Sequence, residues 1–314
     1  MHLVGSGDMG GGVLCVGRNS VDFVFNVDLG RVGPDSKQRT GDPAVLIGGQ
    51  CVNAAVTLAG LGCAVFYAGV VGDDVNGTHV MAFLAERGID GIGVQHARGM
   101  ANPCAYILVD KVTGERCIVE TAPEAYPRFN GKISEAVWTA ASYVYFDGHE
   151  EEASLSIARE AARRGIPTLT DAEIATDGTR SLLALVDTAI VPRATAAEIA
   201  GSGIHGDMLT ALAELGGRRH VVTLGGDGAV GALKGDVPIF VPAQPCVVVD
   251  TTGAGDAFHA GFLFADMEGA PFGNAMIFAA RVAAAVCATP GPSLDRGTLA
   301  ALASSLNRET WLYE

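Results

Sequence analysis

The feature that most constrains the fold is an alternation of short apolar runs with longer segments of helical periodicity. The short runs lie at 13–17, 64–70, 143–147, 166–170, 188–191, 220–224 and 246–249. The helical segments lie at 52–61, 76–87, 152–164, 207–215, 254–267 and 274–288. Buried strands that alternate with helices are typical of βαβ units. We therefore expect an α/β protein of three layers, a doubly wound and mostly parallel sheet with helices on both faces.

Two strand-rich segments, 18–47 and 101–122, interrupt this alternation. In the second, apolar and polar residues alternate, a turn is expected at Thr113-Gly114, and the alternation then resumes, which indicates a hairpin. We expect the two insertions to pair as a small β-sheet lid over the crevice at the strand ends, where open α/β sheets bind ligands. The expected core is then 13–17, 48–100 and 123–314. Residues 1–12 contain G-x-G-x-x-G, but this motif precedes the first strand and opens no helix, so we expect a disordered leader there.

The charge of the chain excludes several kinds of partner. The formal net charge is −14 and the pI is about 4.8, whereas nucleic acids and anionic membranes require a basic surface. No apolar stretch reaches eighteen residues, and the seven cysteines are dispersed without a C-x-x-C pair. We expect a cytoplasmic protein with reduced thiols and no nucleic-acid or membrane partner.

The stretch DTTGAGDAFHAGF, residues 250–262, follows the valine run 247–249. Its glycines lie in a strand-to-helix turn, where Gly253 and Gly255 let backbone amides point outward as an anion-binding site. Asp256 lies in the first helical turn. It is either an acid that favours the start of the helix or a base that accepts a proton from an attacking hydroxyl.

Together with GGQCVNAAVTLAGLGCAVFYAGVVGDD at residues 48–74, this stretch resembles the two signatures of the ribokinase-like, or pfkB-type, carbohydrate kinases. The resemblance covers roughly residues 13–310 and implies an ATP-dependent kinase with a lid. It implies that Asp256 is the catalytic base, and that the amides of Gly253, Ala254 and Gly255 form the anion hole.

The resemblance also implies which residues hold the acceptor. These are Asp22, Gly48, Gly49, Asn53 and Asp147. A carboxylate suits sugar hydroxyls because it accepts charge-assisted hydrogen bonds. From the residues alone, Asp22 fits a solvated strand position and Asn53 a helix cap equally well.

Three further positions bear on the kind of sugar. Ribokinases carry a Lys where this chain has Gln50, which weakens an assignment to ribose. The opening strand, the lid and FDGHEE look nearer to ketohexokinase and the sulfofructose kinases, which have an Arg at the position of His149. Arg116 matches a lid Arg of ketohexokinase and would meet the transferring phosphate or an anionic group of the substrate, unless it is a solvated hairpin charge.

On the nucleotide side, VVTLGGDGAV resembles the ATP-binding strand and turn of the family. Thr223, Gly225 and Gly228, with Thr252, are expected along the phosphates and ribose, although a glycine-rich hairpin turn would look the same. CATPGP, residues 287–292, resembles the loop near adenine and a monovalent-cation (K⁺) site. His259 is expected to lie near the nucleotide and to pack on the helix face without a chemical role.

The magnesium motif departs from the family. Where many members carry Asn-x-x-Glu, this chain has Arg193 and Ala196, and Glu198 fits the surface of a helix. Asp171 and Glu173 would substitute in part through water, since Mg²⁺ keeps several waters and needs few protein ligands.

The sequence thus predicts an ATP- and Mg²⁺-dependent kinase that phosphorylates a primary hydroxyl of a small sugar, a ketose or its derivative. Two alternatives stay open: a nucleoside kinase of the same fold, with Phe23, Phe25 and Tyr106 as the wall for the base, and a catalytically weak sugar sensor. A homodimer through the lid is a further expectation.

Overall fold

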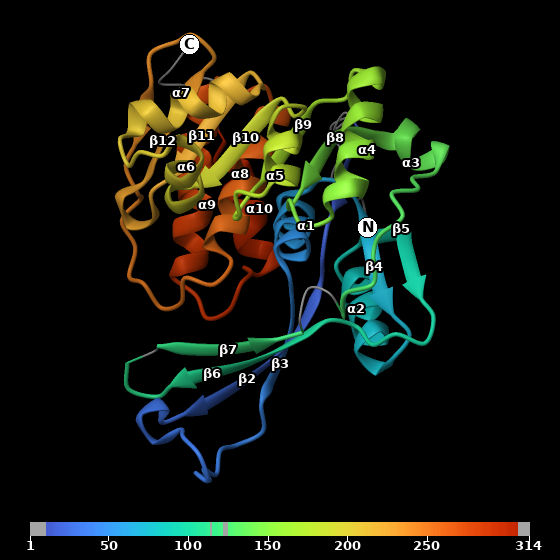
Figure 1. Ribbon diagram of the computed structural model, residues 1–314, viewed down its shortest axis with the longest axis vertical. Helices are drawn as coiled ribbons and strands as arrows, with labels where there is room; N and C mark the ends of the chain where they lie inside the picture. Colours follow the sequence, from blue (N-terminus) through green and yellow to red (C-terminus); the bar gives the residue numbers. More distant parts are fainter. Residues whose placement is uncertain (1–10, 114, 122–124, 307–314) are drawn as a thin grey trace, which may run out of the picture.

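The computed structural model describes residues 11–113, 115–121 and 125–306, and its core is a nine-stranded sheet (Figure 1). The expected leader lies outside these residues except for Gly11 and Gly12, as does Gly114 of the hairpin turn. The strand order is β13-β12-β11-β10-β9-β8-β1-β4-β5, in which β12 and β13 are antiparallel to their neighbours and the other strands are parallel. The strands are β1 (Gly12–Val16), β4 (Val65–Gly72), β5 (Ile89–Ala97), β8 (Ala141–Phe146), β9 (Thr168–Asp171), β10 (Thr188–Pro192), β11 (Arg219–Thr223), β12 (Ala229–Leu233) and β13 (Ile239–Val241).

Helices cover both faces of this sheet, as the alternation predicts. One layer holds α1 (Gln50–Leu61), α2 (Val75–Glu86), α8 (Ala254–Met267), α9 (Phe272–Cys287) and α10 (Arg296–Ser304). The other holds α3 (Glu135–Ala140), α4 (Glu151–Arg164), α5 (Asp177–Leu183), α6 (Arg193–Ala200) and α7 (His205–Leu215). In β1, Val13 and Cys15 pack in the first layer's core, and Leu14 and Val16 in the second, because successive side chains of a strand point to opposite faces. Among the helices so described, none is long and apolar enough to cross a bilayer.

The two insertions join into one four-stranded sheet, as expected for the lid. Its order is β3 (Ala44–Gly48), β2 (Ser20–Val27), β6 (Cys104–Asp110) and β7 (Arg116–Glu120), with β2 and β6 parallel. Figure 1 shows this sheet projecting from one end of the core as a separate layer. The register places Asp22, Ala105 and Glu120 in one row, hence on one face. Phe23 and Tyr106 lie in the next row, on the opposite face.

The prediction of a strand at 246–249 is wrong. No strand is present there, and Val247, Val248 and Val249 are 83, 62 and 57% exposed. β13 is the edge strand of the sheet, and residues 242–249 after it belong to no strand. The amides of Val249 and Asp250 donate instead to the carbonyl of Cys287 at the end of α9. The glycine turn that follows is therefore held against α9 rather than at the end of a strand.

Candidate active site

The glycine turn lies at the start of α8, a helix of fourteen residues. Gly253 is the N-cap with a φ of 74°, and a Cβ there would lie 2.5 Å from the carbonyl oxygen of Pro292, so only glycine fits. A Cβ on Gly255 would meet nothing within 4 Å. The first amides of a helix have no acceptor within it, so this open space faces donors suited to an anion. The amide of Ala254 already donates to Thr251, at 3.3 Å.

Asp250 holds this turn in shape. Its Oδ1 accepts hydrogen bonds from the backbone amide and the hydroxyl of Thr252, at 2.9 and 2.7 Å, and its Oδ2 accepts one from the amide of Gly291 at 3.1 Å. The turn is thereby tied to the 287–292 loop. The hydroxyl hydrogen of Thr252, for which a nucleotide contact was expected, is used within the turn.

Asp256 is buried in the first turn of α8, with 8% of its surface exposed. Its Oδ2 accepts a 2.8 Å hydrogen bond from the side-chain amide of Asn53 on α1. Burial, together with the nearby Asp171 carboxyl, raises the pKa of Asp256 to about 7. An acid that served only to favour the start of a helix would need no such enclosure. A carboxyl that titrates near neutral pH suits a proton acceptor.

His259 lies one turn further along α8 and is almost fully buried. Its Nδ1 lies 2.6 Å from the carbonyl oxygen of Gly255, and its Nε2 lies 3.1 Å from that of Ile190. Burial lowers the pKa of His259. A neutral ring has one N–H, so it donates to only one of these two carbonyl oxygens. His259 is thus buried between the first turn of α8 and β10.

Asp171, at the end of β9, is enclosed rather than open to a metal ion. Its oxygens lie 3.5 Å from Nε2 of His259 and 3.4 Å from Nε2 of Gln50. Burial raises the pKa of Asp171 well above its usual value, with Glu173 and Asp147 adding to the effect. Glu173 is exposed beside it. Of the two acids expected to act through water, Glu173 is therefore the one whose carboxylate fits a hydrated Mg²⁺.

The segment that replaces the family's Asn-x-x-Glu magnesium motif lies at the start of α6. The Arg193 guanidinium forms an ion pair of 2.9 Å with Asp227 in the turn that follows β11. Ala196 is fully buried, and Glu198 is exposed on the helix surface, as expected. Among the residues that the structure describes, no group of three or more His, Cys, Asp or Glu is arranged to hold a metal ion.

Apart from Asn53, which bonds Asp256, the residues expected to hold the acceptor lie at two places. Gly49, Asp147 and His149 line a cavity of about 680 Å³. The carboxylate of Asp147 accepts backbone hydrogen bonds from Arg18 at 2.7 Å and His149 at 3.0 Å, so it joins the ends of β1 and β8. Nε2 of His149 lies 2.5 Å from Oε1 of Gln50, which in turn contacts Asp171.

Asp22 and Gly48 meet where the lid joins the core. A Cβ on Gly48 would lie 2.6 Å from Oδ2 of Asp22, so this close approach requires glycine. Oδ1 of Asp22 accepts a 2.6 Å hydrogen bond from Ser20, and burial raises the pKa of Asp22. Asp22 is therefore not a solvated strand residue. The backbone of Arg116 pairs with Val109 in the lid, and its side chain lies outside what the structure describes.

The nucleotide-side residues form a hairpin turn. Thr223 ends β11, a single 3₁₀ turn, η3 (Gly225–Asp227), follows, and Gly228 leads into β12. The amide of Leu224 donates to the carbonyl of Gly228 at 2.8 Å, and a Cβ on Gly225 would meet nothing within 4 Å. The turn is thus open on its Gly225 side, and its contact with a nucleotide stays a prediction.

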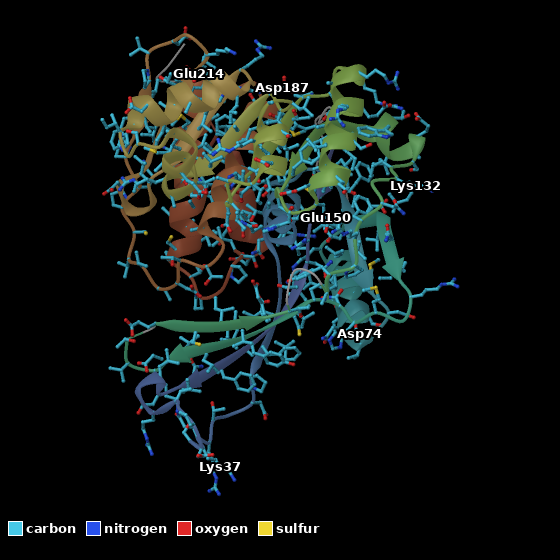
Figure 2. All side chains as sticks on the ribbon, in the orientation of Figure 1. Lys37, Asp74, Lys132, Glu150, Asp187 and Glu214 are labelled. Atoms are coloured by element: carbon cyan, nitrogen blue, oxygen red, sulfur yellow. The ribbon has the colours of Figure 1, made fainter. Side chains whose placement is uncertain are left out.

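Arg18, Asn19, Glu150 and Tyr126 line the same cavity and were missed from the sequence. Arg18 Nε lies 3.3 Å from Glu150 Oε1, and its guanidinium lies 4.4 Å from the ring centre of Tyr126. Figure 2 shows Glu150 in the middle of the molecule, between the core helices and the lid. Their position in the sequence could have indicated them, because Arg18 and Asn19 closely follow the first strand and ligands bind at such strand ends.

A doubly wound sheet, a small lid and a buried carboxyl beside a glycine turn at a helix N-terminus are the parts of a phosphoryl-transfer enzyme. The family model described as "pfkB family carbohydrate kinase" matches residues 12–298, and the chain belongs to that family. It is therefore a phosphotransferase with an alcohol group as acceptor, of a family that uses ATP.

Known proteins agree with this assignment. The chain is 31% identical to a fructokinase from Klebsiella pneumoniae over 69% of its own length and 75% of the relative's. It is 25% identical to a ribokinase from Arabidopsis thaliana, over 88% of this chain and 75% of the relative. The solved structure of Arabidopsis thaliana ribokinase complexed with ribose and ATP has a TM-score of 0.81 at 22% identity, covering 94% of this chain and 99% of that one.

Proposed function

We propose that this chain transfers the γ-phosphate of ATP to a primary hydroxyl of a small sugar, a ketose or its derivative, with Asp256 as the general base. The observation that carries the proposal is the state of Asp256, which is buried, hydrogen-bonded to Asn53 and has a pKa raised to about 7. The fructokinase relative supports a ketose as the acceptor.

The mechanism uses three groups of this chain. A carboxylate oxygen of Asp256 takes the proton of the sugar hydroxyl as the hydroxyl oxygen attacks the γ-phosphorus, and the bond from that phosphorus to the bridging oxygen breaks, so ADP leaves. The amides at the start of α8, around Gly253 and Gly255, hold negative charge that develops on the phosphate oxygens. His259 and Asn53 keep Asp256 and this turn in position. The lid closes over the acceptor and excludes water, which would otherwise compete as a nucleophile.

Metal ions enter the proposal in one limited way. Mg²⁺, when bound, would neutralise charge on the phosphates, and Glu173, exposed beside Asp171, would hold one of its waters. The K⁺ site expected beside the 287–292 loop stays a proposal.

The nucleoside alternative lacks its aromatic wall. Ser20 and Glu120, on one face of the lid, line the cavity. Phe23 and Tyr106, stacked with ring centres 5.3 Å apart, lie on the opposite face, which Phe25 shares. That face also exposes Val119 and Val45, and supports the proposed homodimer through the lid.

The test is ADP formation from ATP across ketoses, aldoses, sugar acids and nucleosides, with the wild type and Asp256→Asn. We expect ketoses to stimulate ADP release most, and the variant to lose roughly 10²–10⁴-fold in kcat. Glu198→Gln, exposed on α6, is the control. The proposal fails if no acceptor stimulates ADP release or if Asp256→Asn keeps full activity. Binding of sugars without turnover would favour a sensor.

A further inference from the structure

The chain crosses from the core to the lid directly after β1, and Arg18 lies at this crossing. β1 ends at Val16, and β2 begins at Ser20. The backbone amide of Arg18 donates to Oδ2 of Asp147, which follows β8, at 2.7 Å. A Cβ on Gly17 would collide with the same carboxylate, so the main chain is packed closely against it. This crossing is therefore fixed to the core by its backbone.

The side chain of Arg18 contacts the segment in which the chain has returned from the lid to the core. The last lid strand, β7, ends at Glu120, and Tyr126 follows it ahead of α3. The guanidinium of Arg18 lies over the Tyr126 ring, 4.4 Å from the ring centre. This distance is within the range of a cation–π interaction. Arg18 thus joins the place where the chain enters the lid to the place where it has left it.

Glu150, the N-cap residue of α4, joins the same two segments. Its Oε1 lies 3.3 Å from Nε of Arg18, and its Oε2 accepts a hydrogen bond from the amide of Phe129 at 3.3 Å. Glu150 is buried, and Arg18 is its one ion-pair partner within the described part of the chain. A buried carboxylate without a cation is costly, so the ion pair favours this arrangement. We call Arg18, Tyr126 and Glu150 the clamp.

Tyr126 also lies close to the acids at the base of the lid. Burial, together with the carboxylates of Glu120 and Asp22, raises the pKa of the Tyr126 hydroxyl, and the charge of Arg18 opposes this effect. Asp22 is the lid residue expected to hold the acceptor, and it is placed by β2, which begins shortly after Arg18. The clamp is thus positioned to fix the base of the lid, and Asp22 with it, relative to the core.

We propose that Arg18 is a positioning residue: the clamp holds the entry to the lid and the return from it together, and so keeps Asp22 where it binds the acceptor. This inference rests on the proposed kinase function and adds residues that control its lid. When the clamp is broken, the two segments move independently, and Asp22 loses its fixed position relative to the core. ATP is expected at the α8 turn, which belongs to the core, so ATP binding does not depend on the clamp.

Two variants of Tyr126 separate its ring from its hydroxyl. Tyr126→Leu keeps an apolar side chain but removes the π face that the guanidinium contacts, whereas Tyr126→Phe keeps that face. With the ketose that releases most ADP, we expect Tyr126→Leu to raise KM for the sugar about fivefold or more, and to change KM for ATP less than about twofold. Tyr126→Phe should match the wild type. The proposal is refuted if the Phe variant is as impaired as the Leu variant, if KM for ATP rises equally, or if the Leu variant is unaffected.

A double-mutant cycle tests whether Arg18 and Tyr126 act through one contact. Arg18→Ala also leaves the Glu150 carboxylate without its cation, so we expect it to raise KM for the sugar more than Tyr126→Leu does and to lower stability. The double variant should be no worse than Arg18→Ala alone, because the contact is already lost. Effects that multiply would contradict the clamp. The control is Arg159→Ala, which removes an exposed arginine on α4 and should keep the wild-type KM.

Hydrogen exchange tests the clamp without any substrate. The amide of Phe129 donates to Glu150 and reports whether this segment stays on the core. We expect it to exchange about tenfold faster in Tyr126→Leu, and at the wild-type rate in Tyr126→Phe and Arg159→Ala. Normal ADP formation with unchanged exchange in Tyr126→Leu refutes the clamp and leaves the kinase function standing. Faster exchange in a protein that releases no ADP with any sugar refutes the kinase function but supports the clamp.

Discussion

Asn53 and Asp256, 203 positions apart in the chain, are joined by a 2.8 Å hydrogen bond between the side-chain amide of one and Oδ2 of the other. The bond crosses from α1 to α8, so the two sequence signatures meet at one atom pair. Because the amide donates to the charged carboxylate, it lowers the pKa of Asp256 and partly offsets the effect of burial.

Replacing Asn53 should therefore change the pH dependence of catalysis. In Asn53→Ala, the pKa of Asp256 rises further, less of it is ionised at pH 7, and kcat there falls about 10-fold or more. Part of the loss should return above pH 8. The measurement is a pH–rate profile. Thr57→Val is the matched control, because Thr57 bonds the carbonyl of Asn53 on the same helix and does not contact Asp256. If the acid limb of the pH–rate profile of Asn53→Ala has its midpoint at the wild-type pH, Asn53 does not lower the pKa of Asp256.

Asp256 should also make the fold less stable as pH rises. Its pKa is raised from the usual 3.8 to about 7, so between these values the folded chain holds a proton that the unfolded chain has lost. The free energy of unfolding then declines from about pH 4 to about pH 7. Asp256→Asn removes this decline and should be more stable than the wild type above pH 7, by at most about 4 kcal/mol.

Urea unfolding of both proteins at several pH values measures this difference. Glu198→Gln should follow the wild-type curve, because its carboxylate is exposed. Parallel curves for the wild type and Asp256→Asn would show that Asp256 is ionised in the folded state throughout.

The two glycines of the α8 turn should respond differently to alanine. Gly253→Ala forces a left-handed φ on a side chain that would lie 2.5 Å from the Pro292 carbonyl, and should cost about 1–3 kcal/mol of stability. Gly255→Ala adds a methyl group to open space, so its Tm should match the wild type. The methyl would obstruct a bound phosphate, and KM for ATP should rise about 10-fold or more. Full ATP affinity in a stable Gly255→Ala would place the phosphate elsewhere.

The proposed homodimer depends on the lid face that carries Phe23 and Tyr106. Val119 lies in the same row and is 61% exposed. Val119→Lys should shift the chain from dimer to monomer in light scattering after size exclusion, because it buries a charge at the interface. Val112→Lys changes a valine that is 92% exposed beyond β6, outside this row, and should leave the mass unchanged. A wild type that is monomeric at all concentrations ends the proposal.

Local patterns predicted the layered architecture, the lid and six of the nine strands of the large sheet, since apolar runs and helical periods report burial directly. They did not predict β5, β12 or β13. They also failed at 246–249, because a run of valines looks the same whether it pairs in a sheet or lies exposed outside it. The buried His259 could not be recognised either, as its contact with Ile190 joins residues 69 positions apart. Gln50 was noted only as a departure from ribokinases, and its contact with Asp171 spans 121 positions.

The position of β1 in the middle of the sheet sets an order for biosynthesis. Its neighbours are β4 and β8, and the lid is complete once β7 ends at Glu120. A ribosome that has delivered the chain through Phe146 has supplied four of the nine strands of the central sheet, the whole lid, Asn19 and Asp22. The turn at Gly253 and the carboxyl of Asp256 emerge more than a hundred residues later. The lid and part of the cavity lining are thus made well before Asp256, which emerges after every strand of the sheet.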